Sequence, residues 1–144
     1  MPHIIMNYSA NLETLSDMQM LCNALADTLL SQRAEDGSQV FPTGGVRLFA
    51  YPAAHCAIAD GGAAAMASGG NGDYGFVYIN LRMGRGRSPL VHTKVGDALL
   101  ATASAHLDAL FRTHHLGLTV QIDESPSQVY DGKRSTLHPL FTHS

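Results

Sequence analysis

A proline at position 2 stands directly before an apolar, β-branched run that is typical of a strand, from His3 to Tyr8. A small second residue normally permits removal of the initiator methionine, which would give Pro2 a free secondary amine. An α-amino group has a pKa of about 7.7–8 in peptides, and burial or nearby cations lower it because they disfavour the charged form. One such group can take a proton from one substrate atom and return it to another. Pro2 is therefore a candidate general acid and base; the alternative is a proline merely tolerated as the first residue of a strand.

Two arginines follow glycine-rich segments and are candidates for binding an acidic substrate. Arg47 comes after Gly44 and Gly45 at the start of a predicted strand, and Arg87 lies in a glycine-framed loop before a predicted helix. A guanidinium binds a carboxylate through two parallel hydrogen bonds and keeps its charge. Arg85 competes with Arg87 for this role, because the same loop presents both side chains. The alternative for each is an ordinary solvated arginine on the surface.

The elements that must position these residues fall into two similar halves. In the first half, the strand from His3 to Tyr8 precedes a helix that begins at a Ser16-x-x-Gln19 capping box and ends near Arg33. A second strand covers Val46 to Tyr51 and continues irregularly to Ile58. The pattern predicts a strand, a helix and a strand in that order.

The second half repeats this order after a glycine-rich segment, 61–72, which reads as a flexible loop. A strand from Tyr74 to Met83 is apolar at nearly every position, as in a strand covered on both faces. Ser88-Pro89 supplies a cap and a first-turn proline for a helix that ends near His114. Residues 116–122 then alternate between apolar and polar, which indicates a half-buried strand.

Each half is thus a βαβ unit, and its helical crossover implies two parallel strands. Residues 3–6 (His-Ile-Ile-Met) align with residues 75–78 (Gly-Phe-Val-Tyr), which indicates an internal duplication. We expect one domain over residues 1–144, with halves at about 1–60 and 73–124 and an irregular C-terminal tail.

The bulk composition argues against several classes of protein. Hydrophobic residues make up 45% of the 144 residues and charged residues 15%, below the roughly 25% charged residues of a typical domain, so we expect an oligomer that hides part of the surface. The net charge is −3 and no basic run occurs, which argues against nucleic acid as a partner. No stretch has the length of a membrane span and no secretory signal precedes the first strand. We expect a cytoplasmic protein.

Four stretches spread over the chain resemble the tautomerase superfamily, and within it the 5-carboxymethyl-2-hydroxymuconate Δ-isomerase family. They are MPHII at 1–5, FPTGGVR at 41–47, DYGFVYINLRMGRGRS at 73–88 and STLHPLF at 135–141. The resemblance implies an α+β two-layer fold, in which the tandem β-α-β units form a four-stranded mixed sheet with two helices on one face. Phe49 departs from the family, since a polar or basic residue is expected there.

The resemblance also implies an activity. It suggests a cofactor-independent isomerase that uses Pro2 as general acid and base on small unsaturated oxo or hydroxy polycarboxylic acids. Arg47 and Arg87 match the family's carboxylate-binding arginines. The family's assembly suggests a homotrimer. A role in the catabolism of aromatic compounds follows from the same resemblance. Two alternatives stay open: a non-catalytic trimeric binding module, and a hydratase-like or dehalogenase-like enzyme of the same fold.

Other patterns are interpreted as structural. Residues 70–75 match G-x-G-x-x-G, but a nucleotide fingerprint needs a strand before it and a helix after it. The histidines show no metal-binding spacing together with a carboxylate. His55 and Cys56 are adjacent in a predicted strand and would point to opposite faces, so they do not form a nucleophile and its base. No metal is expected.

Overall fold

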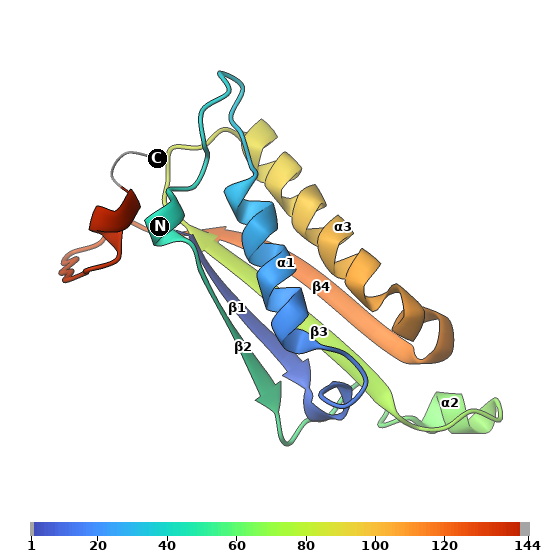
Figure 1. Ribbon diagram of the computed structural model, residues 1–144. Coiled ribbons are helices and arrows are strands. Elements are labelled where there is room, and N and C mark those ends of the chain that lie inside the picture. Colours follow the sequence, from blue (N-terminus) through green and yellow to red (C-terminus); the bar gives the residue numbers. More distant parts are fainter. Residues whose placement is uncertain (1, 142–144) are drawn as a thin grey trace.

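The computed structural model describes residues 2–141, so Met1, on whose removal the amine of Pro2 depends, lies outside the described residues. Two βαβ units form one two-layer structure (Figure 1). The first unit contains β1 (Pro2–Ser9), α1 (Met18–Leu30) and β2 (Arg47–Ala53), and the second contains β3 (Tyr74–Met83), α3 (Pro89–Thr113) and β4 (His115–Glu124). Short helical elements are η1 (Ala10–Leu12), η2 (Thr43–Gly45), α2 (Ala63–Ala67) and η3 (His138–Phe141).

The four strands form a mixed sheet in the order β2-β1-β3-β4. Strands β1 and β2 are parallel, as are β3 and β4, while the central pair β1 and β3 is antiparallel. This order is symmetric about an axis normal to the sheet, which relates one unit to the other. Because rotation about such an axis does not exchange the two faces of the sheet, α1 and α3 lie on the same face, as Figure 1 shows. The expected fold is confirmed.

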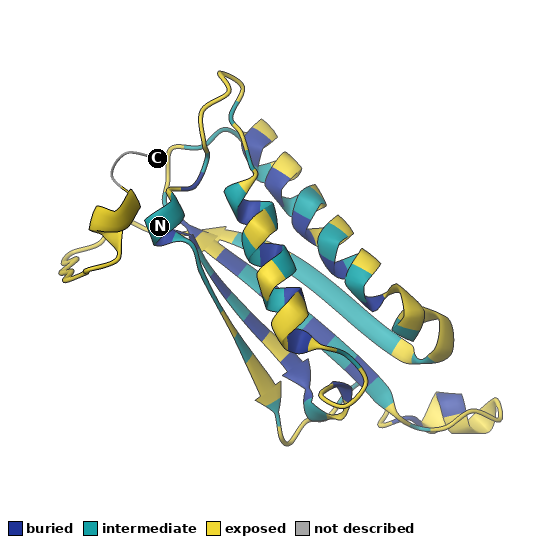
Figure 2. Ribbon diagram, in the orientation of Figure 1, coloured by how far each residue is buried: buried dark blue, intermediate teal, exposed yellow. Residues whose placement is uncertain are grey.

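The core lies between this face and the two helices. Ile4 and Met6 of β1 and Val77 and Ile79 of β3 are fully buried there. The apolar side chains of α1 and α3 recur every three or four residues and pack against these strand residues. Those that are fully or almost fully buried are Leu21, Leu25, Leu29, Val95, Leu99, Ala103 and Leu107. The other face of the sheet carries no helix (Figure 2). Burial of β3 therefore alternates along the strand, and the prediction that β3 is covered on both faces is wrong for this chain.

The same alternation corrects the alignment of the two halves. His3 lies on the open face of the sheet and Ile4 on the helix face, whereas Gly75 is buried and Phe76 is not. His3 therefore corresponds to Tyr74 and not to Gly75, because a shift of one residue exchanges the two faces of a strand.

Three further predictions differ from the structure. The cap of α1 is Asp17, which accepts from the Met20 amide, and the hydroxyl of Ser16 lies 2.9 Å from His106 Nε2 instead. Strand β2 ends at Ala53 and does not continue to Ile58. The segment 61–72 contains the helix α2, because the Asp60 carboxylate accepts hydrogen bonds from the first amides of this turn.

The other boundaries agree with the sequence. Strand β3 has the predicted bounds, and Ser88 caps α3 with Pro89 in its first turn. Among the helices of residues 2–141, none combines the length and the apolar character that a membrane crossing requires.

Candidate active site

Three chain segments meet at one end of the sheet, which we call the Pro2 end. Strands β1 and β2 begin there with Pro2 and Arg47, and β3 ends there with Met83. Pro2 pairs with Met83 across the antiparallel register, and His3 pairs with Arg47 across the parallel one. Neighbouring strands lie roughly 4.8 Å apart, so the register brings the start of β1 close to both neighbours. Pro2 is buried at this position.

Arg47 borders a cavity of about 540 Å³ between β2 and the C-terminal tail. Its side chain is half-buried, and its Nε donates to the Gly45 carbonyl at 3.4 Å. Phe49 lines the same cavity from β2, and residues 131–135, 137 and 138 line it from the C-terminal tail. The cavity thus combines a guanidinium with an aromatic wall, as suits an unsaturated acid.

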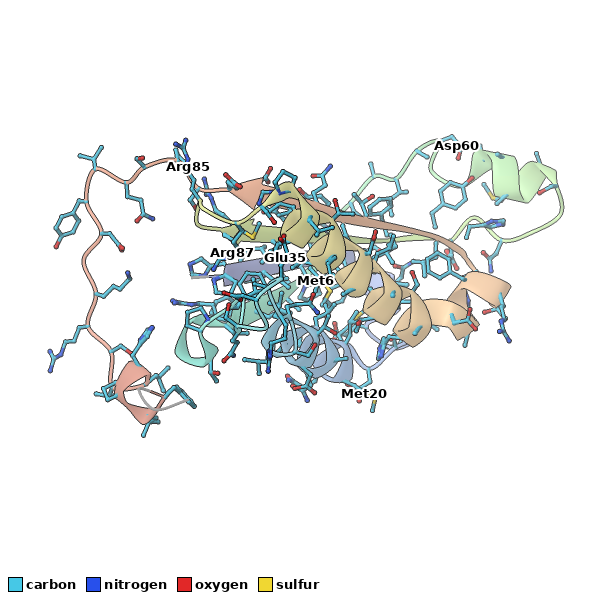
Figure 3. All side chains as sticks on the ribbon, turned by 90° about the horizontal axis from the view of Figure 1, so that it is seen from above. Met6, Met20, Glu35, Asp60, Arg85 and Arg87 are labelled. Carbon is cyan, nitrogen blue, oxygen red and sulfur yellow. The ribbon has the colours of Figure 1, made fainter. Side chains whose placement is uncertain are left out.

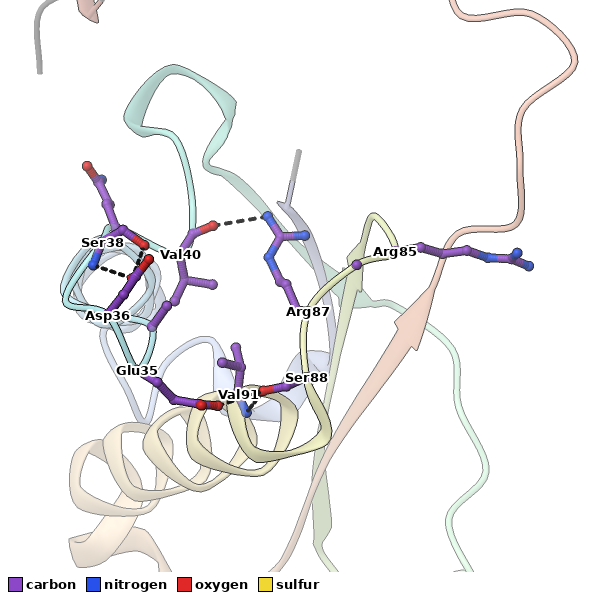
Figure 4. Close-up of a pocket in the computed structure, with 11 residues that line it drawn as sticks. Glu35, Asp36, Ser38, Val40, Arg85, Arg87, Ser88 and Val91 are labelled. Atoms are coloured by element: carbon purple, nitrogen blue, oxygen red, sulfur yellow. Dashed lines mark hydrogen bonds between the residues drawn. The ribbon is translucent and has the colours of Figure 1, made fainter.

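A second cavity, of about 580 Å³, lies between the loop before β2 and the loop after β3, beside the first turn of α3 (Figure 4). Arg85, Gly86 and Arg87 line it from the loop after β3, and residues 34–36 and 38–40 line it from the loop before β2. Pro2 is not among the described residues that line either cavity, but it pairs with Met83, the last residue before the loop that carries Arg87, and the adjacent His3 pairs with Arg47.

Arg87 is held in place by the chain around it. Its Nη2 donates to the Val40 carbonyl at 3.0 Å, its Nη1 donates to the Gly84 carbonyl at 3.1 Å, and its guanidinium lies 4.9 Å from the centre of the Phe41 ring. Burial lowers the pKa of Arg87, while the charge of Glu124 acts in the opposite direction. An arginine nevertheless stays protonated in proteins. Arg87 therefore fixes the wall of the second cavity and places a positive charge there.

Arg85 differs from Arg87 although only one residue separates them. It is exposed, and Figure 4 shows its side chain directed away from the loop that Arg87 contacts. Both arginines lie at the Pro2 end, far from Asp60 at the opposite end of the molecule (Figure 3). The geometry favours Arg87 over Arg85 as the ordered cation.

His3 lies on the open face of the sheet between two arginines. It pairs with Arg47 of β2 and with Arg82 of β3. Burial lowers the pKa of His3, and the positive charges of Arg47, the chain terminus and Arg82 lower it further. The same cations act on any amine at Pro2, in the direction that favours the neutral form of a base.

The patterns interpreted as structural lie away from the Pro2 end. The G-x-G-x-x-G match is preceded by α2 and followed by β3, so it has neither the strand nor the helix of a nucleotide site. His106 contacts Ser16 on the helix layer. Cys56 is exposed in the loop after β2. Within residues 2–141, no group of three or more potential ligands is placed to hold a metal ion.

The tail residues Arg134 and His138, which border the Arg47 cavity, were not predicted as site residues. The sequence signals available were the adjacent Lys133 and Arg134 after an Asp-Gly pair. Neither signal shows that the tail returns to β2.

Comparisons with known proteins agree with the fold. Residues 2–141 match the family described as 5-carboxymethyl-2-hydroxymuconate isomerase. A curated Escherichia coli protein named 5-carboxymethyl-2-hydroxymuconate Delta-isomerase is 27% identical over 141 residues, which cover 98% of this chain and 99% of that protein. A crystal structure of a 5-carboxymethyl-2-hydroxymuconate delta-isomerase has a TM-score of 0.95 at 50% identity and covers 100% of this chain and 95% of its own. A 5-carboxymethyl-2-hydroxymuconate isomerase from Deinococcus radiodurans R1 has a TM-score of 0.78 at 31% identity, covering 97% and 93%.

Proposed function

This chain belongs to the 5-carboxymethyl-2-hydroxymuconate isomerase family, and from that premise we propose that it isomerises 5-carboxymethyl-2-hydroxymuconate, or a close analogue, with Pro2 as the general acid and base. The observation that carries the proposal is the position of Pro2, which begins β1 at the end of the sheet where Arg47 and Arg87 each line a cavity. No cofactor is needed, because the reaction only moves one proton and a pair of double bonds.

The proposed step follows from the structure of the substrate. A 2-hydroxymuconate has a hydroxyl on C2 of a conjugated diene with a carboxylate at each end, and the carboxymethyl group adds a third carboxylate. Pro2 nitrogen takes the hydroxyl proton, the C2–O bond becomes a carbonyl, and the electrons move along the diene to C5. The protonated amine then returns a proton to C5, which leaves a 2-oxo-3-ene acid. Atoms and charge balance without any other reactant.

The proposal requires that Met1 is removed, since Pro2 is otherwise part of an amide and has no basic lone pair. Burial of Pro2 and the nearby arginines support a neutral amine, because both disfavour its protonated form. The ring of proline also fixes the direction of the lone pair, so less orientational freedom is lost in the transition state.

In this proposal Arg47 and Arg87 bind different carboxylates of the substrate. Arg47 binds one carboxylate in the first cavity, where its terminal Nη atoms have no hydrogen-bond partner among residues 2–141. Arg87 uses two of its N–H groups on the carbonyls of Val40 and Gly84, and its remaining donors and charge serve another of the three carboxylates, outside the Arg47 cavity. A guanidinium has five donors, so both tasks are compatible.

We also propose that the chain forms a homotrimer through the open face of the sheet. Away from the Arg47 cavity this face carries Ile5 and Tyr51, and the Tyr51 side chain is 51% exposed. Adjacent apolar residues on an uncovered sheet face are typical of an interface between subunits. The low charged fraction of the chain supports the same proposal.

Light scattering at micromolar concentration tests the assembly. We expect the mass of three chains for the wild type and a smaller species for Tyr51→Glu, because that change buries a charge in the interface. Met20→Glu on the exposed side of α1 is the matched control and should keep the wild-type mass. A wild-type monomer, or a Tyr51→Glu protein of unchanged mass, would contradict the proposed interface.

The cellular setting is part of the same proposal. The six-carbon skeleton of a hydroxymuconate, with a carboxylate at each end, is that of an opened aromatic ring, so the reaction belongs to the catabolism of aromatic compounds. Cys22 and Cys56 are free thiols, which supports a reducing compartment such as the cytoplasm.

The activity is tested by mixing the protein, with its native N-terminus, with 5-carboxymethyl-2-hydroxymuconate. We expect loss of the dienol absorption and, in D₂O, one deuterium at C5 of the product. A product heavier by one water would instead show a hydratase. Binding without turnover would show a non-catalytic binding module, and either result would overturn the proposed isomerase.

A further inference from the structure

The C-terminal tail leaves the sheet at the Pro2 end and returns to it. Residues 125–137 extend away from the body after β4, and η3 then packs on η2 (Figure 1). The contact is close at Gly44: a Cβ there would lie 3.2 Å from Phe141 Cδ2 and 3.3 Å from His138 Cδ2. A Cβ at position 44 would require these neighbours to shift by a few tenths of an ångström, so glycine lets η3 pack closely on η2.

A local cap orders the turn before η3. The Ser135 hydroxyl accepts from the Leu137 amide at 3.0 Å and lies 2.9 Å from His138 Nδ1. The imidazole of His138 is thereby oriented through one nitrogen, which leaves Nε2 for a ligand. The tail thus presents its polar side chains from a fixed turn beside β2.

The charges around the Arg47 cavity are unequal. The tail contributes Lys133, Arg134, His138 and Asp131 to its lining. Lys133 Nζ lies 2.8 Å from Asp131 Oδ2, so these two charges compensate each other. Arg134 has no ion pair with any residue from 2 to 141. The cavity therefore holds two uncompensated guanidinium groups, Arg47 from the sheet and Arg134 from the tail.

We propose that Arg134 and His138 form a second carboxylate subsite, so that the Arg47 cavity selects unsaturated dicarboxylates over monocarboxylates of the same length. That this ligand is also the substrate rests on the proposed function. A volume of about 540 Å³ falls in the usual range for small-molecule sites. The aromatic wall of Phe49 suits the diene, and the two guanidinium groups suit its two ends.

The subsite makes Arg134 a specificity-determining residue. An arginine on the sheet binds a carboxylate in any acid of this class, whereas the tail arginine acts only when a second carboxylate is present. Exposed ion pairs are weak in water, so the effect of Arg134 is moderate and depends on salt.

Muconate and sorbate test the subsite, because both are six-carbon dienoates and only muconate has a carboxylate at each end. Binding is measured by calorimetry at low ionic strength on the full-length protein. We expect the wild type to bind muconate about tenfold more tightly than sorbate, and Arg134→Gln to lose about 5–10-fold for muconate. Sorbate affinity should change less than twofold.

Arg112→Gln is the matched control. Arg112 is an exposed arginine on α3, paired with Asp108 at 2.7 Å, and it does not line the cavity. This variant has the same change of charge as Arg134→Gln and should bind both acids like the wild type. Equal losses for the two arginine variants, or a loss of sorbate binding equal to that of muconate in Arg134→Gln, would overturn the subsite.

The measurement separates this inference from the proposed function, because binding does not require turnover. If the protein lacks isomerase activity but its preference for muconate over sorbate depends on Arg134, the subsite is supported and the proposed function is rejected. If the protein is an active isomerase but binds muconate and sorbate equally, the proposed function is supported and the subsite is rejected.

Discussion

The two ends of the sheet are related by the internal symmetry, yet they differ in chemistry. At the Pro2 end, β1 begins beside β2, and His3 pairs with Arg47. At the opposite end, β3 begins beside β4, and Tyr74 pairs with His115. The position that corresponds to Pro2 is Asp73, whose nitrogen is an amide in the middle of the chain and donates to Asn71. The fold therefore offers two equivalent positions, and the proposed function uses only the one that Pro2 occupies.

The electrostatics of the two ends differ in the same direction. Six of the nine basic residues of the chain lie in the strands, loops and tail that meet at the Pro2 end, namely Arg47, Arg82, Arg85, Arg87, Lys133 and Arg134. The opposite end has Asp73 and Asp60, and Tyr74 with His115 as an edge-to-face pair at 5.9 Å. Backbone symmetry thus places residues in equivalent positions, while side-chain charge decides which end attracts an acidic substrate.

The largest expected effect comes from changing the base. Pro2→Ala still permits removal of Met1 and leaves a primary amine near the same place, so the protein should fold and assemble normally. Its turnover of 5-carboxymethyl-2-hydroxymuconate should fall by roughly 10²–10⁴-fold, the usual contribution of a positioned proton-transfer group. Initial rates and light scattering measure the two properties. An unchanged rate would mean that Pro2 is not the base, so the Pro2 end of the sheet would have no catalytic role that the opposite end lacks.

A smaller effect is expected from the arginine on β2. Arg47→Ala should lower kcat/KM, and the fall should correspond to a loss of about 2–4 kcal/mol of transition-state stabilisation if the guanidinium forms a desolvated pair with a substrate carboxylate. The matched control is His115→Ala, since His115 has the equivalent place on β4, and it should change kcat/KM less than twofold. Equal losses at the two positions would indicate a general effect on the sheet and not a role in binding.

The smallest effect concerns the protonation of His3. Because burial, Arg47, the chain terminus and Arg82 lower its pKa in the folded protein, the unfolded chain binds more protons as the pH falls below about 6.5. This histidine therefore contributes stability at neutral pH that is lost as the pH falls through its folded pKa. Titration by NMR should give a lower midpoint in the native protein than in urea. A native midpoint equal to or above the urea value would contradict the electrostatic account of the Pro2 end.

The sequence predicted those parts of the molecule that depend on local signals. Strand β3 and the Ser88 cap were located from apolar runs and from capping residues, which act over a few positions. Errors occurred where a distant residue decides the outcome. Ser16 does not cap α1, since its hydroxyl contacts His106, which is 90 residues away.

The candidate site also contains some residues whose positions follow from local sequence signals and others whose positions depend on distant contacts. Pro2, Arg47 and Arg87 stand next to recognisable strand starts and glycine turns, so their positions at one end of the sheet followed from the order of the elements. Arg134 lies in a tail without regular structure, and only the packing of η3 on η2 brings it to the Arg47 cavity. No spacing in the sequence encodes that contact.

The central claim is that a free amine on Pro2 performs the proton transfer, and blocking this amine tests it most directly. The rate of isomerisation of 5-carboxymethyl-2-hydroxymuconate is measured for the protein that begins at Pro2 and for the same protein with one residue retained before it. Intact mass confirms the two termini, and light scattering confirms equal assembly. We predict that the extended protein is inactive, below even Pro2→Ala, because an amide has no basic lone pair. Equal rates for the two proteins would contradict the claim and leave Pro2 as the first residue of a strand.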